Sequence, residues 1–130
     1  MDDEPEHIIR LRRPWRRRVD DGPETKVDLP DPQPPTRFDH LSYRRQFNIP
    51  RHLASHRLRL AIDSLPATGV TVRFNGDRLD VPVVEGSRRG GGVLLQLPAW
   101  AGELNELELQ IDRLEPEWPL GPVALWFNDE

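Results

Sequence analysis

The sequence predicts an all-β fold in which two antiparallel sheets pack face to face as a β-sandwich. Three observations support this prediction. Apolar and polar residues alternate along several short segments, Asn75-Gly76 gives a strong hairpin signal, and turn-forming residues recur about every 8–12 residues. A single sheet would leave its apolar face in water, so two packed sheets are the economical arrangement.

The stretch from Tyr43 to Asp80 organises the predicted fold, because it reads as four strands in succession. Period-two alternation places one set of side chains on a buried face and the other set in water. The predicted inward set here is Tyr43, Arg45, Phe47, Ile49, Leu58, Leu60, Ile62, Val70, Val72 and Phe74. The alternate residues on the second strand, Arg57, Arg59, Ala61 and Asp63, would then face solvent.

The segments before this stretch are less regular. Residues 1–6 form an acidic tail that we predict to be disordered, and residues 7–130 form one sandwich domain. His7 to Val19 reads as an edge strand or as two short strands, because Pro14 lacks a ladder donor. Arg13 and Arg17 interrupt its inner face, and a bulge near Pro14 would turn both outward. Residues 30–36 contain four prolines and predict an extended connector.

The segments after it continue the strand pattern, to about eight strands in all. Val81 to Val84 and Val93 to Leu97 read as strands on either side of a glycine-rich loop at 86–92. Ala101 to Leu114 is rich in Glu and Leu, which favour helix, but strict alternation and the bounding Gly102 and Pro116 favour a strand. Val123 to Phe127 predicts a final strand with Trp126 on its opposite face.

Composition excludes several classes of function. The chain has 130 residues, a net charge of −4, 31% charged residues and no cysteine, so disulfides and thiolate metal sites are excluded. The acidic balance argues against a general nucleic-acid binder. No apolar run approaches the roughly 20 residues of a membrane span, and no secretory signal follows Met1, so we expect a cytoplasmic location and no membrane partner.

Several of these segments resemble, in order, the N-terminal sugar-binding domain of glycoside hydrolase family 2. The family's opening segment, which leads to a tryptophan and a basic strand, is similar to residues 9–20, and its tyrosine–arginine–arginine–x–phenylalanine strand is similar to residues 43–50. Residues 27–30, 58–63, 72–76 and 102–107 resemble the segments in between and after. The likeness extends from about Ile8 to Phe127. It implies a jelly-roll sandwich of the galactose-binding-like type.

The sequence also departs from that family. Asp31-Pro32-Gln33 stands where the family usually has a histidine–aspartate–tryptophan-like segment. The catalytic barrel that carries the family's two glutamates has no counterpart in this sequence, so we expect a domain that is not itself an enzyme. Fold resemblance alone does not transfer function.

Charged and metal-binding residue types give no convincing catalytic pattern. Glu103, Glu106, Glu108 and Asp112 are the densest carboxylates, and alternation places the last three on one solvent face rather than in a buried acid–base pair. His52 and His56 have helical metal-ligand spacing but lie in a loop. The arginine cluster at Arg10, Arg12, Arg13, Arg16, Arg17 and Arg18 could bind a polyanion, although pairing with neighbouring acids is favoured.

Tryptophan and arginine residues supply the candidate binding sites. An aromatic ring in a loop can stack on a sugar while arginine binds its hydroxyls, so the candidate ligand residues are Trp100, Trp118, Arg88 and Arg89. Trp15 alternates with apolar residues and resembles the core tryptophan of the family, so we expect it to pack in the core. If the chain instead holds a protein partner, the candidate contacts are Trp126, Arg16 and Arg18.

These residues lead to a leading function and one alternative. The leading function is a non-catalytic carbohydrate-binding module, without a cofactor, that is a monomer or weak homodimer. A structural calcium ion, which carboxylates and backbone carbonyls could bind, stays open. The alternative is a structural or protein-interaction module, which could be an accessory to a separately encoded enzyme.

Overall fold

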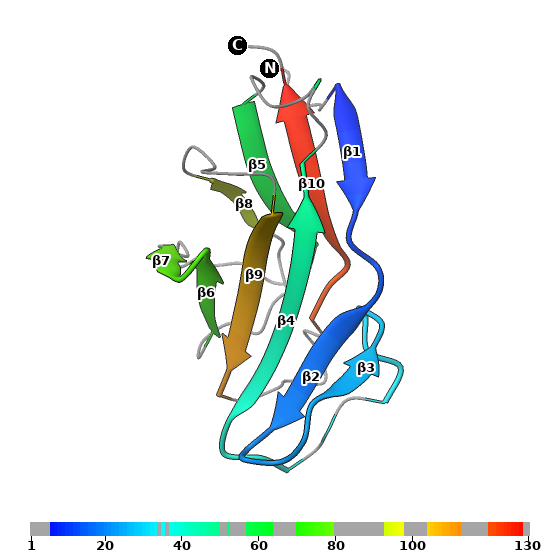
Figure 1. Ribbon diagram of the computed structural model, residues 1–130, viewed down its shortest axis with the longest axis vertical. Coiled ribbons are helices and arrows are strands. Elements are labelled where there is room, and N and C mark those ends of the chain that lie inside the picture. Colours follow the sequence, from blue (N-terminus) through cyan, green and yellow to red (C-terminus); the bar gives the residue numbers. More distant parts are fainter. Residues whose placement is uncertain are drawn as a thin grey trace, which may run out of the picture.

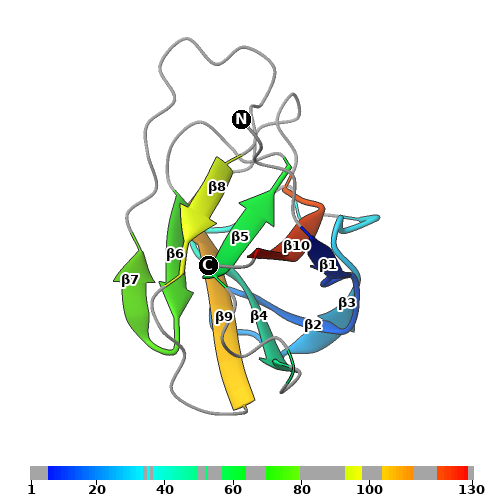
Figure 2. The same ribbon diagram turned by 90° about the horizontal axis from the view of Figure 1, so that it is seen from above.

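The computed structural model confirms the predicted antiparallel β-sandwich (Figures 1 and 2). It describes residues 6–33, 35, 37–49, 52, 57–63, 70–79, 93–97, 104–112 and 120–128. The strands within these ranges are β1 (His7–Arg10), β2 (Trp15–Val19), β3 (Thr25–Val27), β4 (Leu41–Asn48), β5 (Arg57–Ile62), β6 (Val70–Phe74), β7 (Asp77–Leu79), β8 (Val93–Gln96), β9 (Leu104–Ile111) and β10 (Val123–Asn128).

The strands form two sheets that face each other. One sheet has four strands in the order β1–β10–β5–β8, and the other has six strands in the order β3–β2–β4–β9–β6–β7. From β4 onward the chain repeatedly crosses between the sheets, which is the connectivity of a jelly roll. Figure 2, seen from above, shows the two layers, with β4 and β9 opposite β5 and β10. No helix among the described residues is long and apolar enough to cross a membrane.

The core lies between the sheets and is filled by alternate side chains, as predicted. Trp15, Tyr43 and Phe74 from the six-stranded sheet are fully buried, as are Leu125 and Phe127 from the other sheet. Burial of a side chain of this size stabilises the fold by about 1.5–3 kcal/mol. The sandwich is therefore a consequence of the period-two pattern in both sheets.

The helix alternative for the segment after Ala101 is excluded by β9. Leu107, Leu109 and Ile111 are each at most 1% exposed and point into the core, while Glu106 and Glu108 lie on the opposite face. A helix would have brought polar and apolar side chains of this alternating segment onto the same face.

The predicted hairpin at Asn75-Gly76 is confirmed and connects β6 to β7. Asn75 has φ 53° and Gly76 has φ 87°, the left-handed backbone that a tight two-residue turn requires. The Asn75 side chain also accepts a hydrogen bond from the Glu106 N–H at 2.8 Å and donates to the Asn105 side chain at 3.0 Å. The turn is therefore fastened to β9 as well as closed on itself.

The N-terminal segment forms two strands that lie in different sheets. Of the two alternatives for this segment, two short strands is therefore the one confirmed. β1 is an edge strand, but β2 lies between β3 and β4, so an edge position for β2 was wrong. The reason is the short β3, which returns antiparallel and pairs with β2 from Trp15 to Arg17. The described part of the chain has ten strands, where about eight were predicted.

Two further predictions need comment. Arg59 and Ala61 were expected to face solvent, but they are only 8% and 5% exposed. The guanidinium of Arg59 lies over the Trp126 ring, 5.7 Å from its centroid, and donates to the Asn128 side chain at 2.6 Å. The strand predicted at Val81 to Val84 lies outside the described residues.

Candidate functional site

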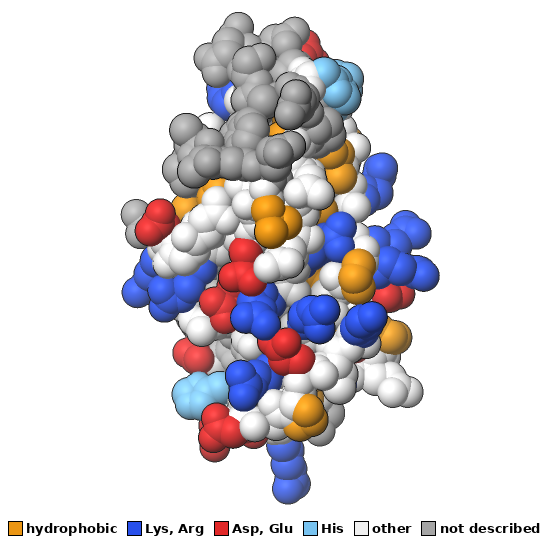
Figure 3. Space-filling view, viewed as in Figure 1, with side chains coloured by type: hydrophobic (Ala, Val, Ile, Leu, Met, Phe, Trp, Pro, Cys, Tyr) orange, Lys and Arg blue, Asp and Glu red, His pale blue; other side chains and the backbone are white. Residues whose placement is uncertain are grey.

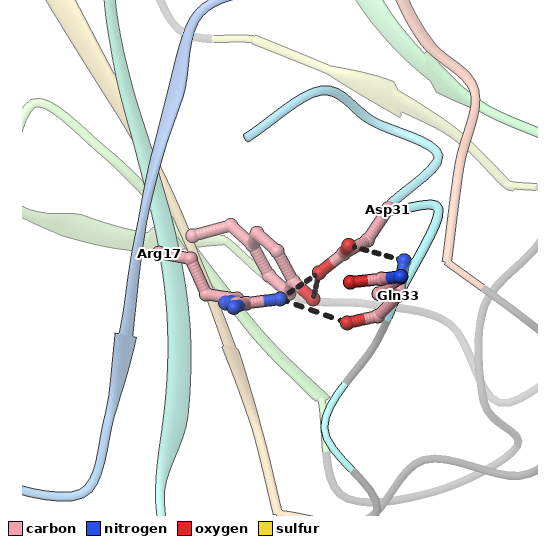
Figure 4. Close-up of polar contacts among 4 residues, drawn as sticks. Arg17, Asp31 and Gln33 are labelled. Carbon is pink, nitrogen blue, oxygen red and sulfur yellow. Dashed lines mark hydrogen bonds and ion pairs between the residues drawn. The ribbon is translucent and has the colours of Figure 1, made fainter. Parts of the chain in front are cut away.

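A partly buried polar cluster lies on the inner side of the six-stranded sheet (Figure 4). Its centre is the Asp31 carboxylate, whose side chain is 5% exposed and which accepts a hydrogen bond from Arg17 at 2.7 Å and from the Tyr43 hydroxyl at 2.8 Å. The other carboxylate oxygen accepts the backbone N–H of Gln33 at 2.9 Å, and Arg17 also donates to the Gln33 carbonyl at 3.0 Å. The cluster binds the proline-rich connector to β2 and β4.

The arrangement explains an arginine that the sequence pattern could not place. Arg17 was predicted to turn outward, and this was wrong. It stays on the inner face between Trp15 and Val19 because Asp31 neutralises it. Arg13 does point outward, with a side chain that is 66% exposed and 3.4 Å from Asp28. The signal for the Arg17 pair was present in the sequence, since an arginine at an inward position requires a buried counter-ion.

The chemistry of this cluster is structural rather than catalytic. Burial, followed by the hydrogen bond to Asp31, raises the pKa of Tyr43 far above its usual range, so its hydroxyl stays neutral and donates. The carboxylate of Asp31 already accepts bonds from three groups. The three side chains therefore hold one another and position the connector.

The outer face of the six-stranded sheet presents a polar surface (Figure 3). In this view the sheet faces the reader, and Lys and Arg side chains cross its middle with Asp and Glu among them. A hollow of about 430 Å³ lies on it, lined by Pro14, Arg16, Glu24, Arg44, Arg45, Gln46 and Glu106. Arg44 is ion-paired in this hollow with Glu24 at 2.5 Å and with Glu106 at 3.6 Å.

Arg45 connects this hollow to the inner side of the sheet. Its guanidinium donates to the Pro14 carbonyl at 3.2 Å, and burial lowers its pKa from the ordinary value. Its Nε atom is buried without a hydrogen-bond partner. This arginine therefore adds a partly desolvated positive charge to the wall of the hollow.

A second hollow, of about 370 Å³, lies farther along the same face. Its lining consists of Arg18, Asp20, Asp21, His40, Leu41, Ser42, Thr71, Glu108, Gln110, Ile111 and Asp112. Asp20 accepts the backbone N–H groups of Asp39 at 2.7 Å and His40 at 2.8 Å, and these bonds, that of His40 first, lower its pKa. The described residues hold no group of three or more side chains suited to a metal ion.

The outer face of the four-stranded sheet carries Trp126. This side chain is half-buried on β10, beside Arg59 on β5. The ring and the guanidinium are thereby held in one position by their cation–π contact.

The structure describes some of the site residues predicted from the sequence and not others. Trp15 is a core residue, as expected, and donates its indole N–H to the Leu11 carbonyl at 2.7 Å. Arg16 and Arg18 lie on the outer face of the six-stranded sheet, whereas Trp126 lies on the outer face of the other sheet, so the three do not form one surface. The ligand candidates Trp100, Trp118, Arg88 and Arg89, and also Glu103 and His56, lie outside the described residues.

Comparison with solved structures identifies the same fold within several glycoside hydrolases, whereas no protein-family model and no curated protein matches the sequence. A β-glucuronidase from an uncultured Clostridium species is similar over 100% of this chain and 30% of its own, with TM-score 0.72 and 17% identity. A β-glucuronidase from glycoside hydrolase family 2 is similar over 99% of this chain and 18% of its own, with TM-score 0.70 and 13% identity.

A third solved structure extends the comparison. The β-glucuronidase from Ruminococcus gnavus in complex with uronic isofagomine matches 98% of this chain and 29% of its own, with TM-score 0.67 and 16% identity. The chain thus spans less than a third of the proteins that it resembles. At these identities the likeness shows the fold, and it confirms the predicted resemblance at that level.

Proposed function

We propose that this chain is a non-catalytic carbohydrate-binding module of the glycoside hydrolase family 2 type. The observation that carries the proposal is the match of the whole sandwich to 30% of a β-glucuronidase. The matched fraction corresponds in size to one domain of such an enzyme and leaves most of that protein without a counterpart here. A domain role, separate from hydrolysis, follows most directly from this relation.

The outer face of the six-stranded sheet supplies the chemistry for binding. Sugar hydroxyls both donate and accept hydrogen bonds, so a saccharide site combines guanidinium or amide donors with carboxylate or amide acceptors. The hollow around Arg44 has donors and acceptors, because its lining includes Arg16, Gln46 and Glu106. Trp100 and Trp118 remain the aromatic residues proposed to contact the ligand.

A glycan array probed with the whole chain tests the proposal. We expect binding to a defined subset of neutral or acidic glycans, followed by a measurable dissociation constant in calorimetry. Trp118→Ala and Trp100→Ala test the two aromatic candidates, and the fold of each variant is checked by its far-ultraviolet circular dichroism. Absence of binding to every glycan on the array would rule out carbohydrate recognition.

The second candidate function is a protein-interaction module, and the Arg59–Trp126 pair favours it. Tryptophan and arginine are enriched at the energetic centres of interfaces, and here both are preorganised on one sheet face. The partner would be a catalytic chain of the glycosidase type. Trp126→Ala should then abolish co-purification with that chain, while Arg16→Ala, on the opposite face, should leave it unchanged. The reverse pattern would exclude this surface.

A further inference from the structure

Strand register aligns six charged residues in one row across the outer face of the six-stranded sheet. Arg16 on β2 lies opposite Lys26 on β3 and Arg44 on β4, which in turn lies opposite Glu108 on β9. Glu108 lies opposite Arg73 on β6, and Arg73 lies opposite Arg78 on β7. We call this line the cationic row; its members are Lys26, Arg16, Arg44, Glu108, Arg73 and Arg78. With strands about 4.8 Å apart, it spans roughly 24 Å.

The row is unfavourable for the fold by itself. Like charges directly opposite each other on neighbouring strands destabilise a sheet, and the row contains three such pairs: Lys26 with Arg16, Arg16 with Arg44, and Arg73 with Arg78. The chain as a whole is acidic, with a net charge of −4. Five cations nevertheless lie in one line across this face, with Glu108 among them.

Most of this positive charge is not neutralised by the protein. Arg44 is the exception, since Glu24 and Glu106 pair with it. Within the part of the chain that the structure describes, the side chains of Lys26, Arg16 and Arg78 make no hydrogen bond or ion pair, and that of Arg73 makes one long contact of 3.5 Å with Gln110. An anionic ligand would relieve the repulsion and find these cations available.

The surroundings of the row favour a saccharide over the other polyanions. Glu24, Glu106 and Glu108 lie among the cations and disfavour a nucleic acid, which carries a phosphate at every nucleotide and has few hydroxyls to bond these carboxylates. No Phe, Tyr or Trp side chain lines the two hollows on this face. A sugar chain carries hydroxyls as well as acidic groups. Its hydroxyls can donate to Glu106 and bond to Gln46 while its acidic groups pair with Arg16 and Lys26.

We propose that the outer face of the six-stranded sheet binds an acidic polysaccharide, whose carboxylate or sulfate groups pair with the cationic row. The proposal rests on the proposed carbohydrate-binding function and adds the class of the ligand and the surface that recognises it. Charge pairing on an exposed sheet is screened by salt, so binding should weaken as ionic strength rises.

Three polymers with one backbone separate the contributions. Dextran, carboxymethyl-dextran and dextran sulfate present the same sugar as a neutral, a carboxylated and a sulfated chain. We expect the whole chain to bind one or both acidic polymers in calorimetry or affinity electrophoresis, and to bind dextran at least about tenfold more weakly, which is about 1.4 kcal/mol. The acidic polymer that binds more tightly identifies the acidic group.

A matched pair of variants tests the surface. Arg16→Gln combined with Lys26→Gln removes two unneutralised cations from the row, and we expect it to weaken binding of the acidic polymer at least about tenfold. Arg10→Gln combined with Arg57→Gln removes the same charge from exposed positions on the four-stranded sheet and should change binding less than about twofold. All four side chains are exposed, so both variants should fold like the parent. The melting temperature of the Arg16→Gln, Lys26→Gln variant should equal or slightly exceed that of the parent, because two like-charge pairs are removed.

Each other outcome overturns the proposal and separates it from the proposed function. Equal loss of binding in both variants would indicate general charge attraction. Equal binding of the three polymers would support carbohydrate recognition but refute the role of the row. No binding to the acidic polymers, together with a positive glycan array, would likewise support carbohydrate recognition and refute the role of the row. Binding of double-stranded DNA as tight as that of the acidic polymers would show that the row binds any polyanion and does not recognise an acidic sugar.

Discussion

Replacing Asp31 with alanine should destabilise the fold more than any loss of a surface ion pair. The carboxylate is 5% exposed and is the acceptor for both Arg17 and Tyr43. Its removal leaves the Arg17 guanidinium without its counter-ion and the Tyr43 phenol without its acceptor, and breaking a buried pair costs about 3–5 kcal/mol. Arg17 is 22% exposed and keeps the Gln33 carbonyl, so we expect the lower end of that range, about 3 kcal/mol.

Urea unfolding followed by tryptophan fluorescence measures this effect, because Trp15 is buried in the core. Asp31→Asn keeps the shape and one acceptor but loses the charge, so it should cost less, about 1 kcal/mol. Asp28→Ala is the matched control. It breaks the exposed pair with Arg13, where the side chains are 66% and 45% exposed, and it should cost less than about 1 kcal/mol.

A double-mutant cycle with Arg17→Ala isolates the interaction between the two charged groups. We expect a coupling free energy above about 1 kcal/mol, since the two side chains share a hydrogen bond. If Asp31→Ala costs no more than Asp28→Ala, or if the cycle shows no coupling, the connector is not held by this cluster and the reasoning fails.

Three further predictions concern the same framework. Tyr43 is the only tyrosine, and its pKa is raised in the folded state from 10.0, so its contribution to stability is complete below pH 10 and is lost as pH rises above 10. Phenolate absorbance should therefore appear at higher pH in the folded chain than in the urea-unfolded chain. Coincident titrations of the two states would refute the burial of Tyr43. Gly76→Ala places a side chain at φ 87° and should cost about 1 kcal/mol in urea unfolding, whereas an unchanged midpoint would contradict the turn geometry. Leu107→Ala in the core should cost about 2–5 kcal/mol, while Leu104→Ala, 61% exposed on the same strand, should cost under about 1 kcal/mol; similar values for both would contradict the register of β9.

The sequence alone determined the layers of this protein. Alternation along Tyr43 to Ile49 and along Leu107 to Ile111 is a local property, since successive side chains of any strand point to opposite faces. The Asn75-Gly76 turn is equally local, because these two residues tolerate the backbone that the hairpin needs. These signals were sufficient for the sandwich and for the resemblance to the family 2 domain.

Only the tertiary structure decided which residues act together. Asp31 is 14 positions from Arg17 in the sequence, and their pairing depends on how the connector folds back over β2. Arg16 and Arg73 share one row because β4 and β9 lie between their strands, and Trp126 lies on the opposite sheet from Arg16. Pairing between strands is non-local, so a pattern that fixes the face of each side chain leaves its neighbours across the sheet open until the register is known.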